Sequence, residues 1–194
     1  MQVVLATHNA HKVVELRQIL GDGLGGIELV AYRGPEPVED GETFAANALI
    51  KARAAFESTG LTSIADDSGI SVDVLDGAPG IHSARYSGTR DDAVNVALLL
   101  RNLVDATNRA AHFTCAAALV DADGEHVETR TWVGSILAEP VGVGGFGYDP
   151  IFKPNGFSVS AGELRAEEKN QFSHRAQAFR ALLPVLRARV NLAL

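Results

Sequence analysis

The sequence has only one cysteine and no long apolar run, and these absences exclude several classes of protein. No apolar run approaches the roughly 18 residues that a membrane-spanning helix needs. The first residues carry no basic segment before their short apolar run, so we expect no signal peptide. The single thiol, Cys115, excludes an internal disulfide and lies in the apolar run FTCAAALV. We therefore expect a buried cysteine and a protein of the reducing cytoplasm.

Positive charge is also scarce. The formal net charge is −7, and no basic run occurs. Duplex nucleic acid is a poor candidate partner, because neutralisation of phosphates supplies most of the affinity for it. A small anionic ligand stays compatible, since a few cations can be focused in one place. Lysine is rare enough for each to merit attention, and the four lysines are Lys12, Lys51, Lys153 and Lys169.

The length of 194 residues, with 46% hydrophobic and 21% charged residues, favours one domain with two lobes and a full core. Hydrophobic spacing predicts strands over 2–6, 27–32, 63–75 and a hairpin over 110–137. It predicts helices over 9–20, 44–59, 92–104 and 173–190, with weaker helical character over 160–171. Strands and helices alternate before the hairpin, so we predict an α/β fold with a mixed sheet flanked by helices.

The stretch LATHNAHK passes from a strand into a helix and carries Thr7, Asn9 and Lys12. Free N–H groups at such a turn can cradle a phosphate, and Lys12 would add positive charge. The stretch lacks the glycines of a P-loop. The alternative is a plain N-cap at Thr7 or Asn9 with a solvated Lys12, and taken alone this stretch favours that interpretation.

Acids and a lysine recur in the next two segments. Asn47 and Lys51 lie four residues apart and share one helix face, behind an acid-rich loop that includes Glu39. Asp66 and Asp67 follow an apolar run, and we interpret them as the end of a strand. Mg²⁺ prefers such oxygen ligands together with substrate phosphates. An exposed helix face and charges that complement a helix dipole are the alternatives, although the dipole explains Asp66 and Asp67 poorly.

Two later motifs could bind a ligand. In GVGGFGYDPIF, glycines bracket Phe146, whose ring could stack on a base, and Asp149 could recognise a base edge. A tight structural loop with a buried Phe146 explains this motif about as well. In SHRAQAF, Arg175 lies in the first turn of a helix, where its charge opposes the helix dipole. Such local conflicts often mark functional positions.

Taken together and in order, these segments resemble the inosine triphosphate pyrophosphatase family, in particular bacterial dITP/XTP pyrophosphatases. The resemblance rests on LATHNAHK, EDGETFAANALIKA, IADDSGISVDVLDGAPGIHSARYSG, TWVG, GGFGYDPIF and EEKNQFSHRAQAF, and it spans nearly the whole chain. It implies an elongated mixed sheet with a central cleft between two lobes, a homodimer, and Mg²⁺-dependent hydrolysis of a purine nucleoside triphosphate to monophosphate and pyrophosphate.

The resemblance also assigns residues. It implies that Asp67, Lys12 and Lys51 are catalytic and that Asp67 and Glu39 bind Mg²⁺. It implies contacts to the substrate from Thr7, His8, Asn9, Ala10, His11, Lys12, Asn47, Ser68, Phe146, Gly147, Tyr148, Asp149, Lys169, His174 and Arg175. Because neighbouring strand residues face opposite ways, Asp66 is expected to orient the backbone of a turn at Ser68–Gly69 or to act behind Asp67.

Two positions depart from the usual family pattern, namely His8 in the first loop and Ala176 after SHR. Neither departure removes a catalytic group. Three other functions stay open: a pyrophosphatase for pyrimidine or modified nucleotides, a non-catalytic nucleotide-binding protein and, disfavoured by charge, a nucleic-acid-binding module. Hydrolysis of different nucleotides would separate the first two from the purine activity.

Overall fold

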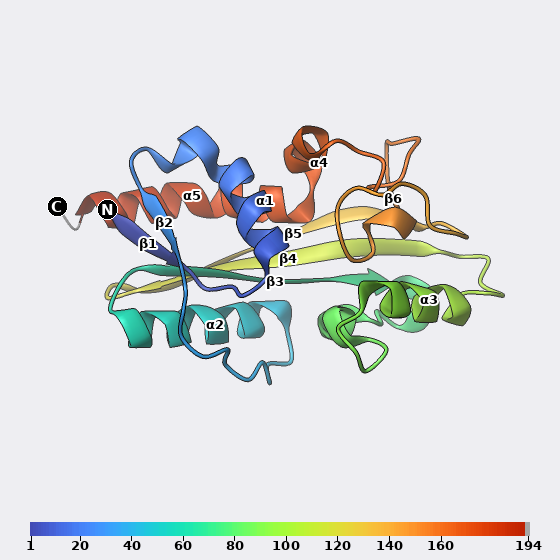
Figure 1. Cartoon of the computed structure of the whole chain (residues 1–194), viewed down its shortest axis with the longest axis horizontal. Helices are drawn as coiled ribbons and strands as arrows, with labels where there is room; N and C mark the ends of the chain where they lie inside the picture. Colours follow the sequence, from blue (N-terminus) through green and yellow to red (C-terminus); the bar gives the residue numbers. More distant parts are fainter. Residues whose placement is uncertain (193–194) are drawn as a thin grey trace. The chain divides into compact units, whose positions relative to one another are not determined.

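The structure is a computed structural model that describes residues 1–192. Within these residues, six strands form one sheet in the order β2-β1-β3-β4-β5-β6 (Figure 1). The strands are β1 Gln2–Leu5, β2 Glu28–Ala31, β3 Ser63–Val72, β4 Ala110–Asp121, β5 Gly124–Ile136 and β6 Phe152–Pro154. Strand β1 pairs in parallel with β2 and β3, whereas β5 and β6 are antiparallel, so the predicted mixed sheet is confirmed.

The helices agree closely with the sequence pattern. They are α1 Ala10–Leu20, α2 Phe44–Thr59, α3 Asp92–Asn102, α4 Ala166–Phe172 and α5 His174–Leu192. Short 3₁₀ turns cover Gly21–Leu24, Asp73–Leu75, Gly80–Arg85 and Asp149–Ile151. Helix α2 shows why its ends were predictable, because Thr43 accepts a hydrogen bond from the Ala46 N–H and Gly60 ends the helix at φ 67°. No helix in the described part of the chain is both long and apolar enough to cross a bilayer.

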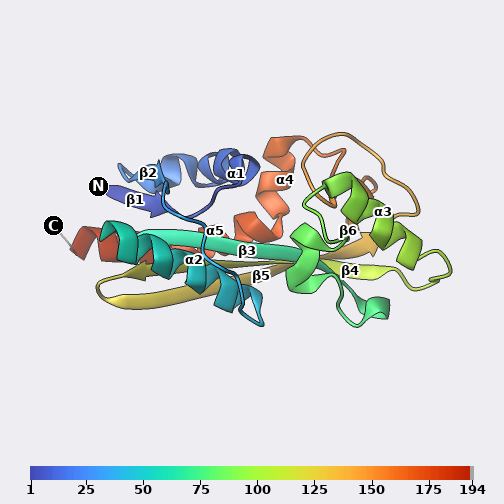
Figure 2. The same cartoon turned by 60° about the horizontal axis from the view of Figure 1, so that its bottom comes forward.

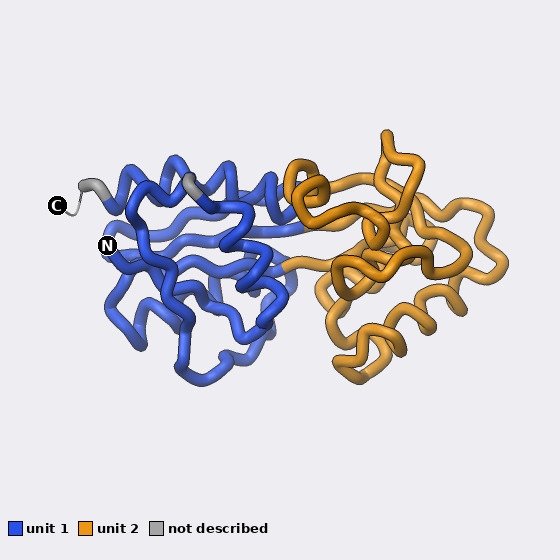
Figure 3. Tube along the Cα trace, turned by 45° about the horizontal axis from the view of Figure 1, so that its top comes forward, with its two compact units in different colours: residues 1–67, 115–130, 174–194 blue, residues 68–114, 131–173 orange. Residues whose placement is uncertain are grey.

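The chain divides into two compact units, shown in separate colours in Figure 3. Unit 1 comprises residues 1–67, 115–130 and 174–194, and unit 2 comprises residues 68–114 and 131–173. Strands β3, β4 and β5 each contribute residues to both units. The central cleft implied by the family resemblance stays a prediction.

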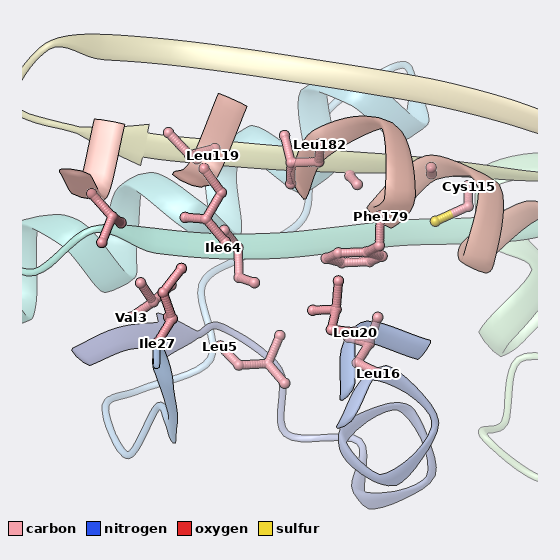
Figure 4. Close-up of a cluster of buried hydrophobic side chains, with 14 residues drawn as sticks. Val3, Leu5, Leu16, Leu20, Ile27, Ile64, Cys115, Leu119, Phe179 and Leu182 are labelled. Atoms are coloured by element: carbon pink, nitrogen blue, oxygen red, sulfur yellow. The ribbon is translucent and has the colours of Figure 1, made fainter. Parts of the chain in front are cut away.

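Unit 1 buries a hydrophobic layer on each face of its strands. On one face, Ile64 and Leu5 pack with Leu16 of α1 and Phe179 of α5 (Figure 4). On the other face, Ala65 of β3 packs with the small side chains of α2, which are Ala48, Ala52 and Ala55. Figure 2 shows α2 running alongside β3. Alternate residues of β3 therefore point to α1 and α5 or to α2, as strand geometry requires. The predicted burial of Cys115 is confirmed on the α1 and α5 face.

Unit 2 has its own core, which is richer in aromatic side chains. Phe152 of β6 lies edge-on to Phe113 of β4 and Trp132 of β5, with ring centroids 4.7 and 5.5 Å apart. Leu99 of α3 and Leu103, the residue that caps its C-terminal end, close this core with fully buried side chains. Large rings fill space efficiently and favour such edge-on contacts.

Two expectations about local structure are wrong. Strand β3 does not end at Asp66 and Asp67 but continues without interruption to Val72, so there is no turn at Ser68–Gly69. The two acids do not break the strand, because lysine and arginine side chains neutralise them on both faces. Strand β6 was not predicted, since its three residues are too few to show a period of two.

Candidate functional site

Strand β3 delivers its two acids to opposite faces of unit 1. Asp66 is two residues from Ile64, so its side chain lies on the same face of β3. It points toward α1 and α5, where Lys12 and Arg175 contact it. Asp67 is two residues from Ala65, so its side chain lies on the opposite face and points toward α2, where Lys51 contacts it. The expectation that strand geometry separates the two acids is confirmed.

Asp66 is the buried centre of an ion-pair network. Its Oδ2 accepts hydrogen bonds from Lys12 Nζ at 2.9 Å and from Nε and Nη2 of Arg175 at 3.2 Å each. Arg175 also donates through Nη1 to Oε2 of Glu15 at 2.6 Å. Burial alone would raise the pKa of Asp66, but the charges of Lys12 and Arg175 outweigh it and hold that pKa well below its ordinary value. We therefore expect Asp66 to be ionised at neutral pH.

The other oxygen of Asp66 is less well satisfied. Asp66 Oδ1 is buried and accepts no hydrogen bond from any residue that the structure describes. The nearby thiol of Cys115 lies 3.9 Å from Oδ2, not from Oδ1. A buried acceptor without a partner costs free energy, which the three hydrogen bonds to Oδ2 help to offset.

Asp67 forms a second, more open group with α2. Lys51 Nζ donates to Asp67 Oδ1 at 2.9 Å and to Glu39 Oε2 at 3.1 Å. The side chains of Asp67 and Glu39 are 12% and 17% exposed, whereas that of Asp66 is fully buried. Burial raises the pKa of Asp67 above its ordinary value despite Lys51. Asp67 thus combines access to solvent with a stronger affinity for a proton than an ordinary aspartate has.

We call these seven side chains the unit 1 charge group; they are Lys12, Glu15, Glu39, Lys51, Asp66, Asp67 and Arg175. Burial alone would lower the pKa of Lys51, but Asp67, Asp66 and Glu39 raise it above its ordinary value. Among the described residues, no cluster of three or more His, Cys, Asp or Glu side chains forms a ready-made metal cage. The group instead suits a cation held by one or two carboxylates that also binds substrate phosphates, which is typical of Mg²⁺.

The loop before α1 is organised by Asn9. The Asn9 side chain accepts hydrogen bonds from the N–H groups of His11 and Lys12 at 2.9 and 3.2 Å, and Thr7 Oγ1 accepts one from the Asn9 N–H. The N-cap interpretation of this stretch is therefore confirmed. Lys12 is not a solvated side chain, because it reaches Asp66. Of the two other predicted contacts here, His8 lies 3.0 Å from the carbonyl oxygen of Gly34 and Ala10 begins the helix.

Asn47 holds the acid-rich loop in place. It is buried, and its Oδ1 accepts a hydrogen bond from the Gly41 N–H at 2.9 Å. Because Gly41 is two residues from Glu39, this bond helps to fix the position of Glu39 relative to Lys51.

Two other residues that the resemblance assigns to the substrate lie near these groups in the chain. His174, the first residue of α5, is buried. Ser68 directly follows Asp67 in β3.

Unit 2 contains a separate buried pair. Lys169 Nζ donates to Asp149 Oδ2 at 2.6 Å, and the two side chains are 6% and 3% exposed. The same Oδ2 accepts a hydrogen bond from the Phe146 N–H at 2.8 Å, and Lys169 Nζ lies 5.0 Å from the centre of the Phe146 ring. A Cβ on Gly145, where φ is 70°, would overlap the Asp149 carboxylate. This glycine therefore allows the chain to approach the pair closely.

Comparison with known proteins identifies the family. The family model of the Ham1 family matches residues 3–185. The chain belongs to the Ham1 family. It is 57% identical to a dITP/XTP pyrophosphatase of Leifsonia xyli over 97% of this chain and 96% of the relative, and 52% identical to a dITP/XTP pyrophosphatase of Streptomyces coelicolor over 96% and 97%. A solved Ham1 protein from Coxiella burnetii superposes with a TM-score of 0.88 at 38% identity, covering 97% of this chain and 99% of the other.

Membership of the Ham1 family confirms the predicted family and the mixed α/β fold. The roles that the resemblance assigns to single residues stay predictions. The structure also brings in residues that the sequence reasoning missed. The sequence weakly indicated that Glu15 belongs to the unit 1 charge group, because Glu15 lies three residues after Lys12 on the same helix face. The sequence did not indicate the contact of Asp92, since its partner Gly147 is 55 residues away in the chain.

Proposed function

We propose that this Ham1 protein is a nucleoside triphosphate pyrophosphatase that hydrolyses dITP, ITP and XTP to the monophosphate and pyrophosphate. The observation that carries the proposal is the unit 1 charge group, in which Asp67, Glu39 and Lys51 meet at a partly exposed position. Relatives at 57% and 52% identity bear the name dITP/XTP pyrophosphatase, which supports the same activity.

In the proposed reaction, a water oxygen forms a bond to the α-phosphorus of the nucleotide. The bond from the α-phosphorus to the bridging oxygen breaks, and pyrophosphate leaves with the electron pair. Asp67 orients the water and accepts its proton as the general base. Lys12 and Lys51 stabilise the negative charge that develops on the phosphate oxygens.

Mg²⁺ is the cation that the residues of unit 1 fit. Asp67 and Glu39 would hold it, since both carboxylates contact Lys51 at a partly exposed position. When bound, Mg²⁺ would neutralise phosphate charge and so make pyrophosphate a better leaving group. Hydrolysis should therefore stop when the cation is removed by a chelator and return when Mg²⁺ is added.

Unit 2 would recognise the base. Phe146 offers a ring for stacking, and Asp149 and Lys169 offer a hydrogen-bonding pair whose geometry is fixed. Tyr148 and Gly147 complete the predicted set within unit 2. Selection of purines with a 6-keto group would follow if the site leaves the amino group of adenine unmatched.

The deciding experiment is a substrate panel with detection of released pyrophosphate, with and without Mg²⁺. The panel contains dITP, ITP, XTP, dGTP, dATP, dUTP and dTTP. Faster release from the 6-keto purines dITP and XTP supports the proposal. Faster release from dUTP or dTTP would instead favour the pyrimidine alternative. Binding of dITP without any release of pyrophosphate would indicate a nucleotide-binding protein.

Two further properties belong to the same proposal. The family resemblance supports a homodimer, which light scattering on the purified protein would test. The free thiol of Cys115 supports a location in the reducing cytoplasm, which fractionation of the source cells would test. Neither property is needed for the proposed chemistry in unit 1.

A further inference from the structure

A long-range hydrogen bond in unit 2 ties the segment around Phe146 to helix α3. The Gly147 N–H donates to Asp92 Oδ2 at 2.9 Å, across 55 residues of sequence. Asp92 is the first residue of α3, and the N-cap is its neighbour Asp91. The Asp91 side chain caps the helix by accepting hydrogen bonds from the Ala93 and Val94 N–H groups. Asp92 is therefore available for a contact outside its own helix.

Two carboxylates together fix the backbone on both sides of the Phe146 carbonyl. The Phe146 N–H donates to Asp149 at 2.8 Å, and the next N–H along the chain, that of Gly147, donates to Asp92. Gly147 adopts φ 60°, a left-handed conformation in which glycine is favoured. Glycine is conformationally permissive, so this bond supplies a restraint that the residue itself does not provide.

Helix α3 also organises the loop that contains SARYSG. Buried Asn95, one turn after Asp92, accepts a hydrogen bond from the Ser87 N–H at 2.8 Å and donates to the Ala84 carbonyl oxygen at 3.3 Å. The Tyr148 hydroxyl then donates to the carbonyl oxygen of Ser83 at 2.8 Å. The start of α3 is thus a common anchor for this loop and for the Phe146 segment, residues 145–149.

We propose that Asp92 is a positioning residue for base recognition, which sets the orientation of the Phe146 ring through the Gly147 peptide. The inference rests on the proposed function, because it takes Phe146 as the residue that contacts the base. Asp92 itself need not touch the nucleotide. Its removal should weaken the use of the preferred base and leave the chemistry at the triphosphate intact.

The test compares Asp92→Ala, Asp92→Asn and the matched control Asp91→Ala, with dITP and dATP as substrates. In Asp92→Ala, we expect KM for dITP to rise about tenfold, as for the loss of one hydrogen bond to a charged group, with kcat little changed. The preference for dITP over dATP should narrow by a similar factor. Asp92→Asn keeps an acceptor oxygen, so its KM for dITP and its preference for dITP over dATP should lie close to those of the wild type. Asp91→Ala loses a helix cap, so it should lower the melting temperature and leave KM and the preference unchanged.

Equal losses for dITP and dATP in Asp92→Ala, or an unchanged KM for dITP, would overturn the positioning role while the proposed function stands. If the wild-type chain hydrolyses no nucleotide, the proposed function fails instead. Calorimetry with dIMP then decides the positioning role, which requires about tenfold weaker binding in Asp92→Ala than in wild type. Unchanged affinity, or no binding to wild type, would contradict it.

Discussion

Unit 1 and unit 2 bury charge in different ways. The unit 1 charge group sets four acids against three cations, and its Asp67 and Glu39 side chains keep 12% and 17% of their surface exposed. In unit 2, Lys169 and Asp149 form an ion pair whose side chains are 6% and 3% exposed. Partly exposed carboxylates suit a site that admits a cation, whereas a buried ion pair suits a rigid surface that presents fixed donors and acceptors.

The proposed function gives the two units separate tasks. Chemistry at phosphorus would depend on unit 1, where charge can change when a substrate and a cation arrive. Selection of the base would depend on unit 2, where the hydrogen bonds of Asp149 are already made. Variants in unit 1 should then alter turnover for every base, and variants in unit 2 should alter the ratio between bases.

The largest effect is expected for Asp67→Asn. Loss of the proton acceptor should lower kcat for dITP at least about a hundredfold, since general-base catalysis contributes on that order. The loss should be the same factor for dITP and for dGTP, because the change lies in unit 1. Initial rates of pyrophosphate release, with circular dichroism to confirm folding, measure this. Near wild-type turnover would remove Asp67 from the mechanism.

Asp66→Asn should instead act on stability. The change leaves Lys12 and Arg175 around a neutral group, and breaking a buried ion pair costs about 3 kcal/mol of unfolding free energy. Activity per folded molecule should fall less than in Asp67→Asn. Urea unfolding curves in the presence of a chelator give the free energy. Higher activity in Asp67→Asn than in Asp66→Asn would show that the two faces of β3 have the opposite roles.

The stability from Asp66 should also depend on pH. Its pKa is lowered in the folded protein from an ordinary value of 3.8, so the folded state binds fewer protons than the unfolded state. The contribution is therefore fully present above pH 3.8 and is lost as the pH falls below it. The difference between wild type and Asp66→Asn should be constant above about pH 5 and should shrink as the pH falls from about 4 to about 3. A difference that stays constant over this range would contradict the ion-pair explanation.

The contrast between Asp66 and Asp67 also shows how far the sequence alone could go. Alternation along a strand predicts opposite faces for neighbouring residues, and that prediction is confirmed. Helix ends were equally predictable where a cap residue such as Thr43 marks them. The contact between Asp66 and Arg175 was not predictable, because the two residues are 109 apart in the chain and only the packing of α5 brings them close. The contact between Asp92 and Gly147 could not be predicted for the same reason.

In unit 2, Asp149→Asn should change selectivity more than rate. An amide oxygen can still accept the Phe146 hydrogen bond, but the ion pair with Lys169 is lost. We expect kcat/KM for dITP to fall about tenfold and the preference for dITP over dATP to narrow, as for one hydrogen bond to a charged group. The ratio of kcat/KM values for the two nucleotides measures this. An equal loss for both would mean that unit 2 does not select the base.

The smallest effect is expected for Arg53→Ala. This variant tests whether burial or contact geometry sets the strength of an ion pair. Arg53 lies on α2 two residues after Lys51 and contacts both oxygens of Glu125 at 2.6 and 2.7 Å. These distances are shorter than those around Asp66, but the two side chains are 47% and 38% exposed, so water screens the pair. The unfolding free energy should fall by at most about 1 kcal/mol, and pyrophosphate release should not change. A loss as large as that of Asp66→Asn would mean that contact geometry, and not burial, sets the strength of the ion pairs in unit 1.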